Sequence, residues 1–435
     1  MTDYSLLICI GTLFILLIFG SPVIFAIGAA ALTYFVVEPG MWPAVSVYAH
    51  KFFTGMDVFI WLSIPLFVVA GEVMAQIGMT DRLLQFSRLL VGRFRGGLAY
   101  MNIMASMLFG GVSGSALADI SALGPVEVRM MKQDGYRADF ATALTVSSAI
   151  QGPVIPPSIP LIIFASLTNT SIGALFLAGI VPGIMIGLGL FLVVAIMVRR
   201  HGFGRRPIEG LTAALAVRIV LEAFWALFMP AIILGGIVFG VFTATEAAAV
   251  AVAYAVLIGF LVYRNLSLKQ LWGVLDRSAR TTAAVYLIIG FASIISWIFA
   301  AERVPSLLSD FIAHIDVSVL VVLLLLNLFF LFNGLWISDS VQLLLFAPLF
   351  TPIVAELGVH PVQFGVIMVV NVMISLITPP YGLALYLGSA VGGVTLGALV
   401  RQTWPFLLSS LTVLVLVTLV PALSLTLPRL FGFIE

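Results

Sequence analysis

Two pairs of consecutive prolines, Pro156-Pro157 and Pro379-Pro380, interrupt apolar segments in different halves of this chain. Three further pairs of landmarks have the same sequence spacing, here called the repeat offset: Pro125 with Pro348, Gly135 with Gly358, and Pro182 with Pro405. Proline cannot donate the backbone hydrogen bond of a helix and clashes with the preceding turn, so each pair should break a helix and free carbonyl oxygens. The chain is therefore predicted to contain two related halves, each with a broken helix, which is typical of secondary transporters.

The composition places both halves in a lipid bilayer. Of the 435 residues, 62% are hydrophobic and only 9% are charged, whereas soluble domains have roughly 25% charged residues. No polar stretch is long enough for a separate soluble domain. The net charge of +1 argues against nucleic-acid binding, and the single cysteine, Cys9, excludes an internal disulfide. The fold class is therefore predicted to be an all-α, multi-pass membrane protein.

Full membrane crossings need roughly 20 mainly apolar residues each. The predicted crossings are residues 5–20, 21–37, 58–79, 138–169, 174–198, 220–241, 243–262, 281–301, 362–392 and 404–427. One tilted helix over residues 5–37 is an alternative, but Gly20-Ser21-Pro22 favours two. Because no basic segment precedes residues 5–20, they are interpreted as a retained span rather than a signal peptide. Residues 38–57 and 263–280 mix aromatic and charged residues and are predicted to lie along the membrane interface.

Two segments, 98–131 and 318–357, are too long for one crossing and are predicted to be re-entrant helical hairpins. Their centres are small and polar, with the sequences GGVSGS at 110–115 and NGLWIS at 333–338. Basic residues mark cytoplasmic loops. They flank the first hairpin on both sides, whereas mainly acidic residues flank the second. These residues are Arg82, Arg88, Arg93, Arg95, Arg129, Lys132 and Arg137 for the first, and Glu302, Asp310, Asp316 and Glu356 for the second.

The first hairpin is therefore expected to open to the cytoplasm and the second to the periplasm, so the two halves have inverted topology. Residues 1–217 form the first predicted repeat and residues 218–435 the second. Each repeat has about five spans, one hairpin and one broken helix, at 138–169 and 362–392 respectively. Both termini are expected outside the cell.

The hairpin tips and the helix breaks are predicted to surround a binding site at mid-membrane depth. Irregular backbone is tolerated there only where it is buried in protein or lines a cavity. Freed carbonyl oxygens and hydroxyl groups suit sodium, and the positive ends of helices that start at the tips suit an anionic substrate. A single motif of this kind is often only a kink or a packing surface, but two matched pairs favour a site.

Candidate residues follow from these four points. The candidate substrate-binding residues are Ser113, Ser115, Ser158, Asn333, Ser338 and Thr378. The candidate sodium ligands are Gly111, Ser113, Ser115, Gly152, Val154 and Pro156 in the first half, and Asn333, Gly334, Ser338, Thr378, Pro379 and Gly382 in the second. No cofactor is expected besides the coupling sodium ions.

Several acidic residues lie within or near the predicted site. Asp119 and Asp339 follow the tips, and each is a candidate for binding a cation or carrying a proton. The alternative for both is a capping role at the positive start of the following helix. Glu246 is predicted to form a capping box with Thr243. Glu72 is predicted either to pair with a nearby group or to line the cavity.

Four motifs in this chain resemble the large membrane subunit of TRAP transporters, the tripartite ATP-independent periplasmic family (DctM-like). They are SGSALAD at 113–119, GPVIPPS at 152–158, GVFTATEAAAVAVAY at 240–254 and LITPPYG at 376–382. The resemblance covers essentially the whole chain. It implies a sodium-driven elevator transporter of the bacterial inner membrane, with one sodium site at each pair of tip and break and substrate between the tips.

The resemblance also implies two protein partners. One is a small four-helix membrane subunit, and the other is a soluble periplasmic protein that delivers an organic acid anion, such as a C4-dicarboxylate or sialic acid. The chain departs from the family pattern at the second tip, where Ser338 replaces a common aspartate and Asp339 follows one place later. Ala244 replaces a common proline in the Thr243–Glu246 motif.

Other functions remain as alternatives to this hypothesis. A stand-alone sodium- or proton-coupled anion carrier fits the same architecture. Saturable uptake that depends on a sodium gradient would exclude a channel, whereas a conductance far above carrier turnover would support one. An intramembrane enzyme is disfavoured, because the chain has no H-E-x-x-H, Gly-x-Ser-x-Gly or Gly-x-Gly-Asp motif.

Overall fold

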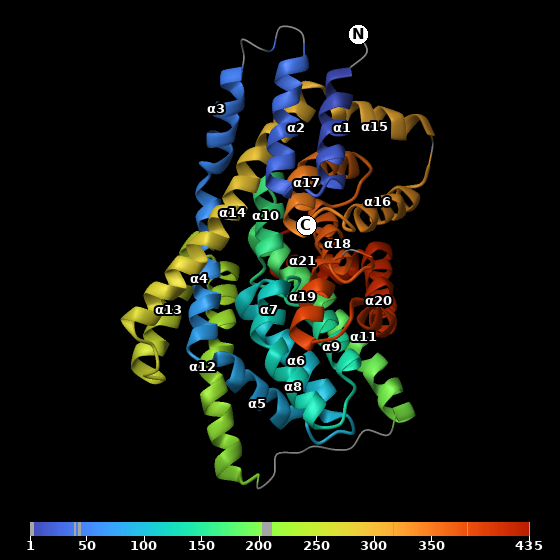
Figure 1. Ribbon diagram of the computed structural model, residues 1–435. Coiled ribbons are helices and arrows are strands. Elements are labelled where there is room, and N and C mark those ends of the chain that lie inside the picture. Colours follow the sequence, from blue (N-terminus) through green and yellow to red (C-terminus); the bar gives the residue numbers. More distant parts are fainter. Residues whose placement is uncertain are drawn as a thin grey trace.

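The computed structural model describes residues 4–38, 41, 45–201, 211–315, 317–380 and 382–434. Asp316 and Tyr381, which belong to a predicted flank and a predicted motif, lie outside these residues. Over the described residues, all regular elements are helices, arranged in a tall bundle (Figure 1). The prediction of an all-α fold is confirmed.

The N-terminal region begins with two separate helices, in agreement with the preferred prediction for residues 5–37. α1 (Tyr4–Ile18) and α2 (Val23–Val37) each have 15 residues and pack side by side. At 1.5 Å per residue each is about 22 Å long, shorter than the roughly 30 Å of a hydrocarbon core. They are followed by α3 (Val45–Met56), the 3₁₀ turn η2 (Phe59–Leu62), α4 (Ser63–Gln76) and α5 (Met79–Val91).

The two segments predicted to lie along the membrane interface are both largely helical. The first contains α3, which packs along the later turns of α14 (Leu268–Ala301), where Phe52 lies against Gly290. Both helices run through the upper left of Figure 1. Residues 268–280 of the second segment do not form an element of their own, because they are the first turns of α14, which has 34 residues. Ser267 and Gln270 form a capping box that starts this helix before the predicted crossing.

The first predicted hairpin and broken helix each form a pair of helices with a short connection. α6 (Gly97–Ser113) and α7 (Ala116–Ala122) meet at Gly114, whose φ of 59° is left-handed, and α8 (Gly124–Gln133) continues the second arm. α9 (Ala138–Ala149) and α10 (Ile159–Thr168) are separated by the proline break, and α11 (Ile172–His201) follows. Ser115 caps α7 by accepting a hydrogen bond from the N–H of Ala118 at 3.4 Å.

The second half has corresponding elements. Its hairpin is α16 (Val319–Asn333) and α17 (Asp339–Glu356), its broken helix is α18 (Pro361–Ser375) and α19 (Leu383–Gly392), and α20 (Leu396–Leu419) and α21 (Ala422–Leu430) follow. The remaining helices are α12 (Ala213–Val238), α13 (Ala244–Leu257) with the π-helical turn η3 (Ile258–Val262), and α15 (Val304–Ile315). Thr243 and Glu246 form the predicted capping box at the start of α13.

Landmarks that repeat in the sequence also repeat in conformation. The Pro156-Pro157 and Pro379-Pro380 peptide bonds are both cis. Gly135 and Gly358 both have left-handed φ angles, of 87° and 84°. Ser115 and Ser338, which are also separated by the repeat offset, are the N-cap residues of α7 and α17. The two breaks thus share a cis proline bond, whereas the two tips share an N-cap serine whose side chain forms the cap only at Ser115.

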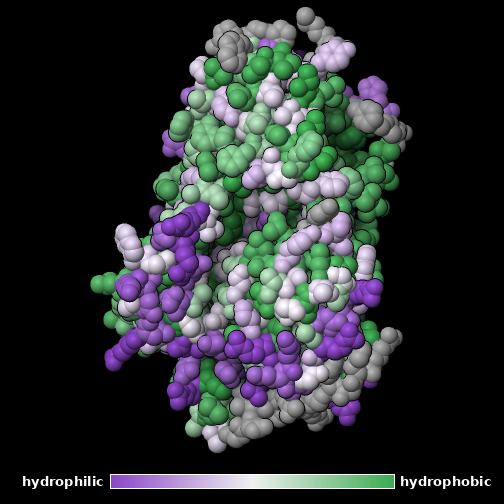
Figure 2. Space-filling view, viewed as in Figure 1, coloured by the Kyte–Doolittle hydropathy of each residue, from purple (hydrophilic) through white to green (hydrophobic). Residues whose placement is uncertain are grey.

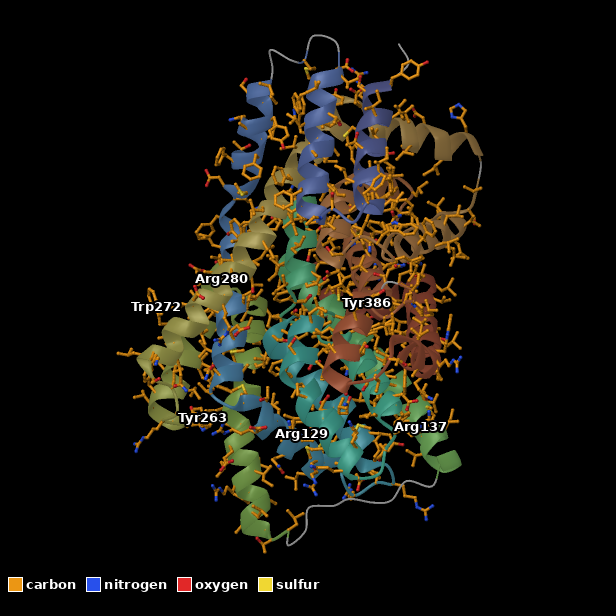
Figure 3. The ribbon with its side chains drawn as sticks, viewed as in Figure 1. Arg129, Arg137, Tyr263, Trp272, Arg280 and Tyr386 are labelled. Carbon is orange, nitrogen blue, oxygen red and sulfur yellow. The ribbon has the colours of Figure 1, made fainter. Side chains whose placement is uncertain are left out.

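Helix length and surface composition agree with a membrane location. Within the described residues, seven helices are long and apolar enough to cross a membrane. They are Phe59–Gln76, Ile172–Arg199, Ala213–Val238, Ala244–Val262, Leu268–Ala301, Asp339–Glu356 and Leu396–Leu419. Hydrophilic residues form a band across the lower part of the surface (Figure 2), and Arg129 and Arg137 lie at that end (Figure 3).

Candidate functional site

A cavity of about 520 Å³ lies between two groups of helices. One wall comes from α4 and α14, which contribute Glu72 and Thr281. The opposite wall is the first hairpin tip, from Ser113 to Ala122, with the start of α10. In Figure 1, α4 and α14 lie to the left of α7 and α10, and the surface is hollowed in this region in Figure 2. Asp339 and Ser340 of the second tip also line the cavity, so residues of both tips meet there.

The first tip and the first break cross at glycine residues. A β-carbon on Gly110 would overlap with the Cα of Gly152, and one on Gly152 would lie 2.9 Å from the Cα of Gly110. A β-carbon on Gly114 would lie 2.8 Å from the carbonyl oxygen of Pro157. Only residues without side chains allow this approach. The backbone of the tip is therefore held against the carbonyl groups of the break.

Most carbonyl oxygens of the first break accept no hydrogen bond from the residues that the structure describes. No backbone hydrogen bond from the described part of the chain reaches the carbonyl oxygens of Gly152, Val154 or Pro156. Unpaired carbonyl oxygens at membrane depth are what a hard cation such as sodium requires. They do not all face the tip, however. The carbonyl oxygen of Pro156 lies beside Gly111 of the tip, whereas that of Val154 lies beside Gly179 of α11.

Ser158 has a structural role at the end of the break. Its hydroxyl donates to the carbonyl oxygen of Pro153 and accepts from the N–H of Leu161 at 3.2 Å. Ser158 is fully buried. It therefore caps α10 and does not line the cavity.

The second tip and break are packed as closely as the first, but more of their polar groups already take part in hydrogen bonds. A β-carbon on Gly334 would overlap with the side chain of Ser375. Asn333 donates to the carbonyl oxygen of Phe329 at 2.8 Å, and the Thr378 hydroxyl donates to that of Ile374 at 2.9 Å. The carbonyl oxygen of Thr378 accepts from Gly382 at 3.1 Å. A cation at the second tip and break would have to use the second lone pairs of these oxygens or the carbonyl oxygens of the two prolines.

The predicted substrate residues do not all face one space. Ser113 and Ser115 line the cavity of about 520 Å³. Ser338 instead lines a separate cavity of about 760 Å³, between the second tip, α1 and α19, whose walls include Phe14, Ile18 and Tyr386. Ser158, Asn333 and Thr378 line neither cavity. Sequence reasoning missed Ser121 and Ser340, which do line the first one. Their position shortly beyond a predicted tip was the available signal.

The two predicted carboxylates occupy different environments. Asp339 borders the cavity in the first turn of α17. Asp119 is only 1% exposed. The repeat offset equates Asp119 with Gln342, which is also fully buried, and not with Asp339. The two acids are therefore not equivalent positions of the two halves.

A buried polar ladder connects the arms of the first hairpin to α9. The Asn102 amide donates to Oε2 of Glu127 at 2.8 Å and to Oγ1 of Thr145 at 2.6 Å. Ser148 donates to Oδ1 of Asn102 at 2.8 Å and lies 3.1 Å from the hydroxyl of Ser106. Glu127 is 0% exposed. It was missed in the sequence, although an acidic residue inside a predicted re-entrant hairpin is itself a signal.

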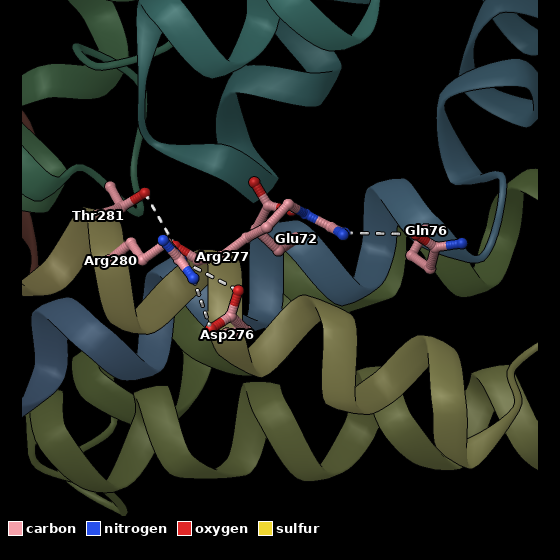
Figure 4. A network of polar contacts seen from close by, with 6 residues as sticks. All are labelled: Glu72, Gln76, Asp276, Arg277, Arg280 and Thr281. Atoms are coloured by element: carbon pink, nitrogen blue, oxygen red, sulfur yellow. Dashed lines mark hydrogen bonds and ion pairs between the residues drawn. The ribbon is translucent and has the colours of Figure 1, made fainter.

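Glu72 both lines the cavity and forms an ion pair. Its Oε2 lies 3.2 Å from Nε of Arg277 on α14, and Arg277 also donates to Gln76 at 3.4 Å (Figure 4). Arg280 pairs with Asp276 at 3.0 Å on the same helix (Figure 4). Glu72 therefore pairs with a nearby group and also lines the cavity, which the sequence had offered as alternatives. Because Arg277 balances its charge, Glu72 does not make this wall strongly negative.

The chemistry and the fold of the site agree with a transporter. No group of three or more His, Cys, Asp and Glu side chains in the described residues is arranged to hold a metal ion. An all-helical membrane bundle with two tips, two broken helices and a central cavity defines a secondary-transporter fold.

Solved structures with a similar fold are transporters. The structure is similar to the YdaH transporter of Alcanivorax borkumensis, with a TM-score of 0.65, 16% identity, and coverage of 96% of this chain and 98% of that one. It is also similar to MtrF of Neisseria gonorrhoeae, with a TM-score of 0.61 and 15% identity over 88% and 85% of the chains.

Sequence comparison identifies the family within this fold. Residues 10–423 match the model of the tripartite ATP-independent periplasmic transporter, DctM component. The chain is 40% identical to the sialic acid TRAP transporter large permease protein SiaM of Vibrio cholerae, over 96% of each chain. It is 38% identical to the C4-dicarboxylate TRAP transporter large permease protein DctM of Pseudomonas aeruginosa, over 93% of each chain. The chain therefore belongs to the DctM family and is the large permease component of a TRAP transporter, a multi-pass protein of the bacterial inner membrane.

Proposed function

We propose that this permease imports an organic acid anion by sodium-coupled, binding-protein-dependent secondary transport. The observation that carries the proposal is the contact of the first tip with a break in which most carbonyl oxygens accept no hydrogen bond from the described residues, directly beside the cavity of about 520 Å³. Two related permeases are named for sialic acid and C4-dicarboxylates, which are both carboxylates. The start of α17 lines the cavity through Asp339 and Ser340, and the positive end of a helix suits such an anion.

The first sodium site is proposed between the first tip and the first break, which offer more oxygens without a hydrogen bond from the described residues than the second tip and break do. The carbonyl oxygens of Pro156 and Pro157 lie beside Gly111 and Gly114 of the tip, and the hydroxyl groups of Ser113 and Ser115 are close in sequence to this crossing. The second site is proposed at the equivalent position, between the tip at 333–338 and the break from Thr378 to Gly382. Its oxygens are partly used in hydrogen bonds, so we expect the second site to bind sodium more weakly than the first.

Transport is proposed to follow an elevator mechanism in which the two hairpins and two broken helices move against α4 and α14. The cavity lies between these two groups of helices, as such a mechanism requires. The shared conformations at tips and breaks support an origin of the halves, 1–217 and 218–435, as inverted repeats. Asp339, but not the fully buried Asp119, borders the proposed substrate site.

The proposed partners are those of a tripartite system. A small four-helix membrane subunit would pack against this permease, and a periplasmic binding protein would deliver the anion. The runner-up proposal is a stand-alone sodium- or proton-coupled anion carrier, which would need neither partner.

Reconstitution into liposomes tests these proposals. We expect uptake of the anion only when the permease, its small subunit, the loaded binding protein and an inward sodium gradient are all present. Uptake by the permease alone would favour the stand-alone carrier. Uptake that persists with a proton gradient and no sodium would refute sodium coupling, and a conductance far above carrier turnover would indicate a channel.

Hydroxyl ligands at the two sites are tested by Ser115→Ala and Thr378→Ala. Each variant should lower the apparent affinity of transport for sodium by roughly fivefold, because a ligand worth about 1 kcal/mol is lost. Ser121→Ala is the matched control for Ser115→Ala, since Ser121 lines the same cavity but lies beyond the tip at residues 110–115. Sodium titrations of uptake at constant expression provide the measurement. An unchanged sodium affinity in both variants would remove these residues from the sites.

A further inference from the structure

A groove of about 770 Å³ lies between α5, α12 and the end of α13, and it shares no lining residue with the central cavity. Its floor is apolar and includes Val217, Leu221 and Trp225 of α12 and Val262 of η3. Its polar rim is formed by Arg82, Arg218, Glu222 and Tyr263. Tyr263 lies at the same level as Arg129 and Arg137 (Figure 3), the end that basic residues assign to the cytoplasm. The groove thus combines an apolar floor and a charged rim at the level of lipid headgroups.

Arg82 is fixed in place by three contacts. Its guanidinium group lies 3.6 Å from the centre of the Tyr263 ring. One terminal nitrogen donates to the carbonyl oxygens of Ile77 at 2.9 Å and Gly78 at 2.8 Å. Its Nε is buried and has no hydrogen-bond partner among the described residues. Arg82 therefore presents a preoriented positive charge at the groove.

The charges of the rim do not cancel. Arg218 forms an ion pair with Glu222 at 2.8 Å on α12, and both side chains are largely exposed. Among the described residues, the rim carries two positive charges, on Arg82 and Arg218, and one negative charge, on Glu222. One additional negative charge would balance it. A zwitterionic ligand brings its own positive charge and would leave the rim uncompensated.

The start of α12 adds hydrogen-bond donors to the same groove. Thr212 caps the helix by accepting from the N–H of Leu215 at 3.2 Å. The N–H groups of Ala213 and Ala214 have no acceptor among the described residues, and both alanines line the groove. Unpaired N–H groups and the helix dipole favour an anion at this position, and phosphate oxygens are the usual acceptors.

We propose that this groove binds one anionic phospholipid of the cytoplasmic leaflet, of the phosphatidylglycerol type. The phosphodiester is held by Arg82, Arg218 and the first N–H groups of α12, and an acyl chain lies along Leu221, Trp225 and Val262. Basic pockets between membrane helices on the cytoplasmic side are suited to such headgroups. The lipid bridges α5 to α12, and α5 leads directly into the first hairpin through residues 92–96. It would therefore stabilise the junction between the wall of the cavity and the hairpin.

Native mass spectrometry of the full-length permease tests the proposal. The protein is delipidated in detergent and titrated with equimolar mixed micelles of phosphatidylglycerol and phosphatidylcholine. We expect one tightly retained phosphatidylglycerol. Arg218→Gln should weaken its retention about fivefold, because one cation near the membrane surface contributes about 1 kcal/mol. Arg82→Gln should weaken it at least as much, although loss of its contacts to Ile77 and Gly78 can also disturb folding.

Two further variants separate lipid binding from folding and from general surface charge. Glu222→Gln frees Arg218 and raises the rim charge, so it should strengthen retention. Arg129→Gln removes an exposed arginine at the same end, away from the groove, and should change nothing. Equal retention of both lipids would overturn the proposal, as would an equal loss in the Arg129 variant. Displacement of the lipid by millimolar inorganic phosphate would instead assign the groove to a free anion.

Discussion

A Gly110→Ala permease should lose at least about tenfold of its transport activity and unfold at a lower temperature than the wild-type protein. The added methyl group would overlap with the Cα of Gly152, an atom of the backbone that cannot rotate away. To accommodate it, α6 must separate from the break, and overpacking of this kind costs about 1–3 kcal/mol. A separation there also moves the tip away from the carbonyl oxygens of Pro156 and Pro157. Tenfold in activity corresponds to about 1.4 kcal/mol.

Gly235→Ala is the matched control for this prediction. Gly235 also lies inside a helix, α12, but a β-carbon there would meet nothing within 4 Å. Alanine is favoured over glycine in a helix by about 1 kcal/mol, so this variant should be neutral or slightly more stable. Thermal unfolding in detergent and reconstituted uptake should both be measured for the two variants. If Gly110→Ala behaves like Gly235→Ala, the tip and the break do not cross in van der Waals contact at Gly110 and Gly152.

The sequence was sufficient to predict where the backbone is irregular. Proline and glycine restrict the backbone locally, so the breaks at Pro156 and Pro379 and the turn at Gly114 could be located without knowledge of any partner helix. The N-cap position shared by Ser115 and Ser338 could also have been deduced from the repeat offset. Local chemistry thus determines the positions of the tips and the breaks.

The sequence was not sufficient to predict which space each side chain faces. Ser338 and Ser115 are both N-cap residues at a tip, yet they line different cavities, because α1 and α19 pack beside the second tip and α4 and α14 beside the first. In the sequence, Asp119 and Asp339 both lie shortly beyond a tip and are candidates for the same role. The structure shows one buried and one bordering the cavity, because the two acids occupy different positions on the turns of their helices.

Replacing Glu127 by leucine should destabilise the permease strongly, whereas replacing it by glutamine should have a small effect on stability. Oε2 of Glu127 accepts a hydrogen bond from Asn102 at 2.8 Å in a region where both side chains are 0% exposed. Leucine leaves this N–H donor buried without its acceptor, which costs about 1–3 kcal/mol. It also disturbs the link from Asn102 to Thr145 and Ser148. Glutamine keeps the size and one acceptor oxygen, so the ladder is retained.

Measuring unfolding temperature and uptake together separates two roles of Glu127. If glutamine preserves both properties, the carboxyl group serves only to hold α8 against α6, as the contact with Asn102 indicates. If it preserves the unfolding temperature but abolishes uptake, the charge or proton of Glu127 takes part in coupling. A leucine variant as stable as the wild-type protein would contradict the stabilising role of the ladder. The second half provides a reason to expect the structural role. There, a comparable contact joins Asn371 to Asn327 at 2.8 Å without an acid. The repeat offset places Phe350, which has no charge or proton to transfer, at the position equivalent to Glu127.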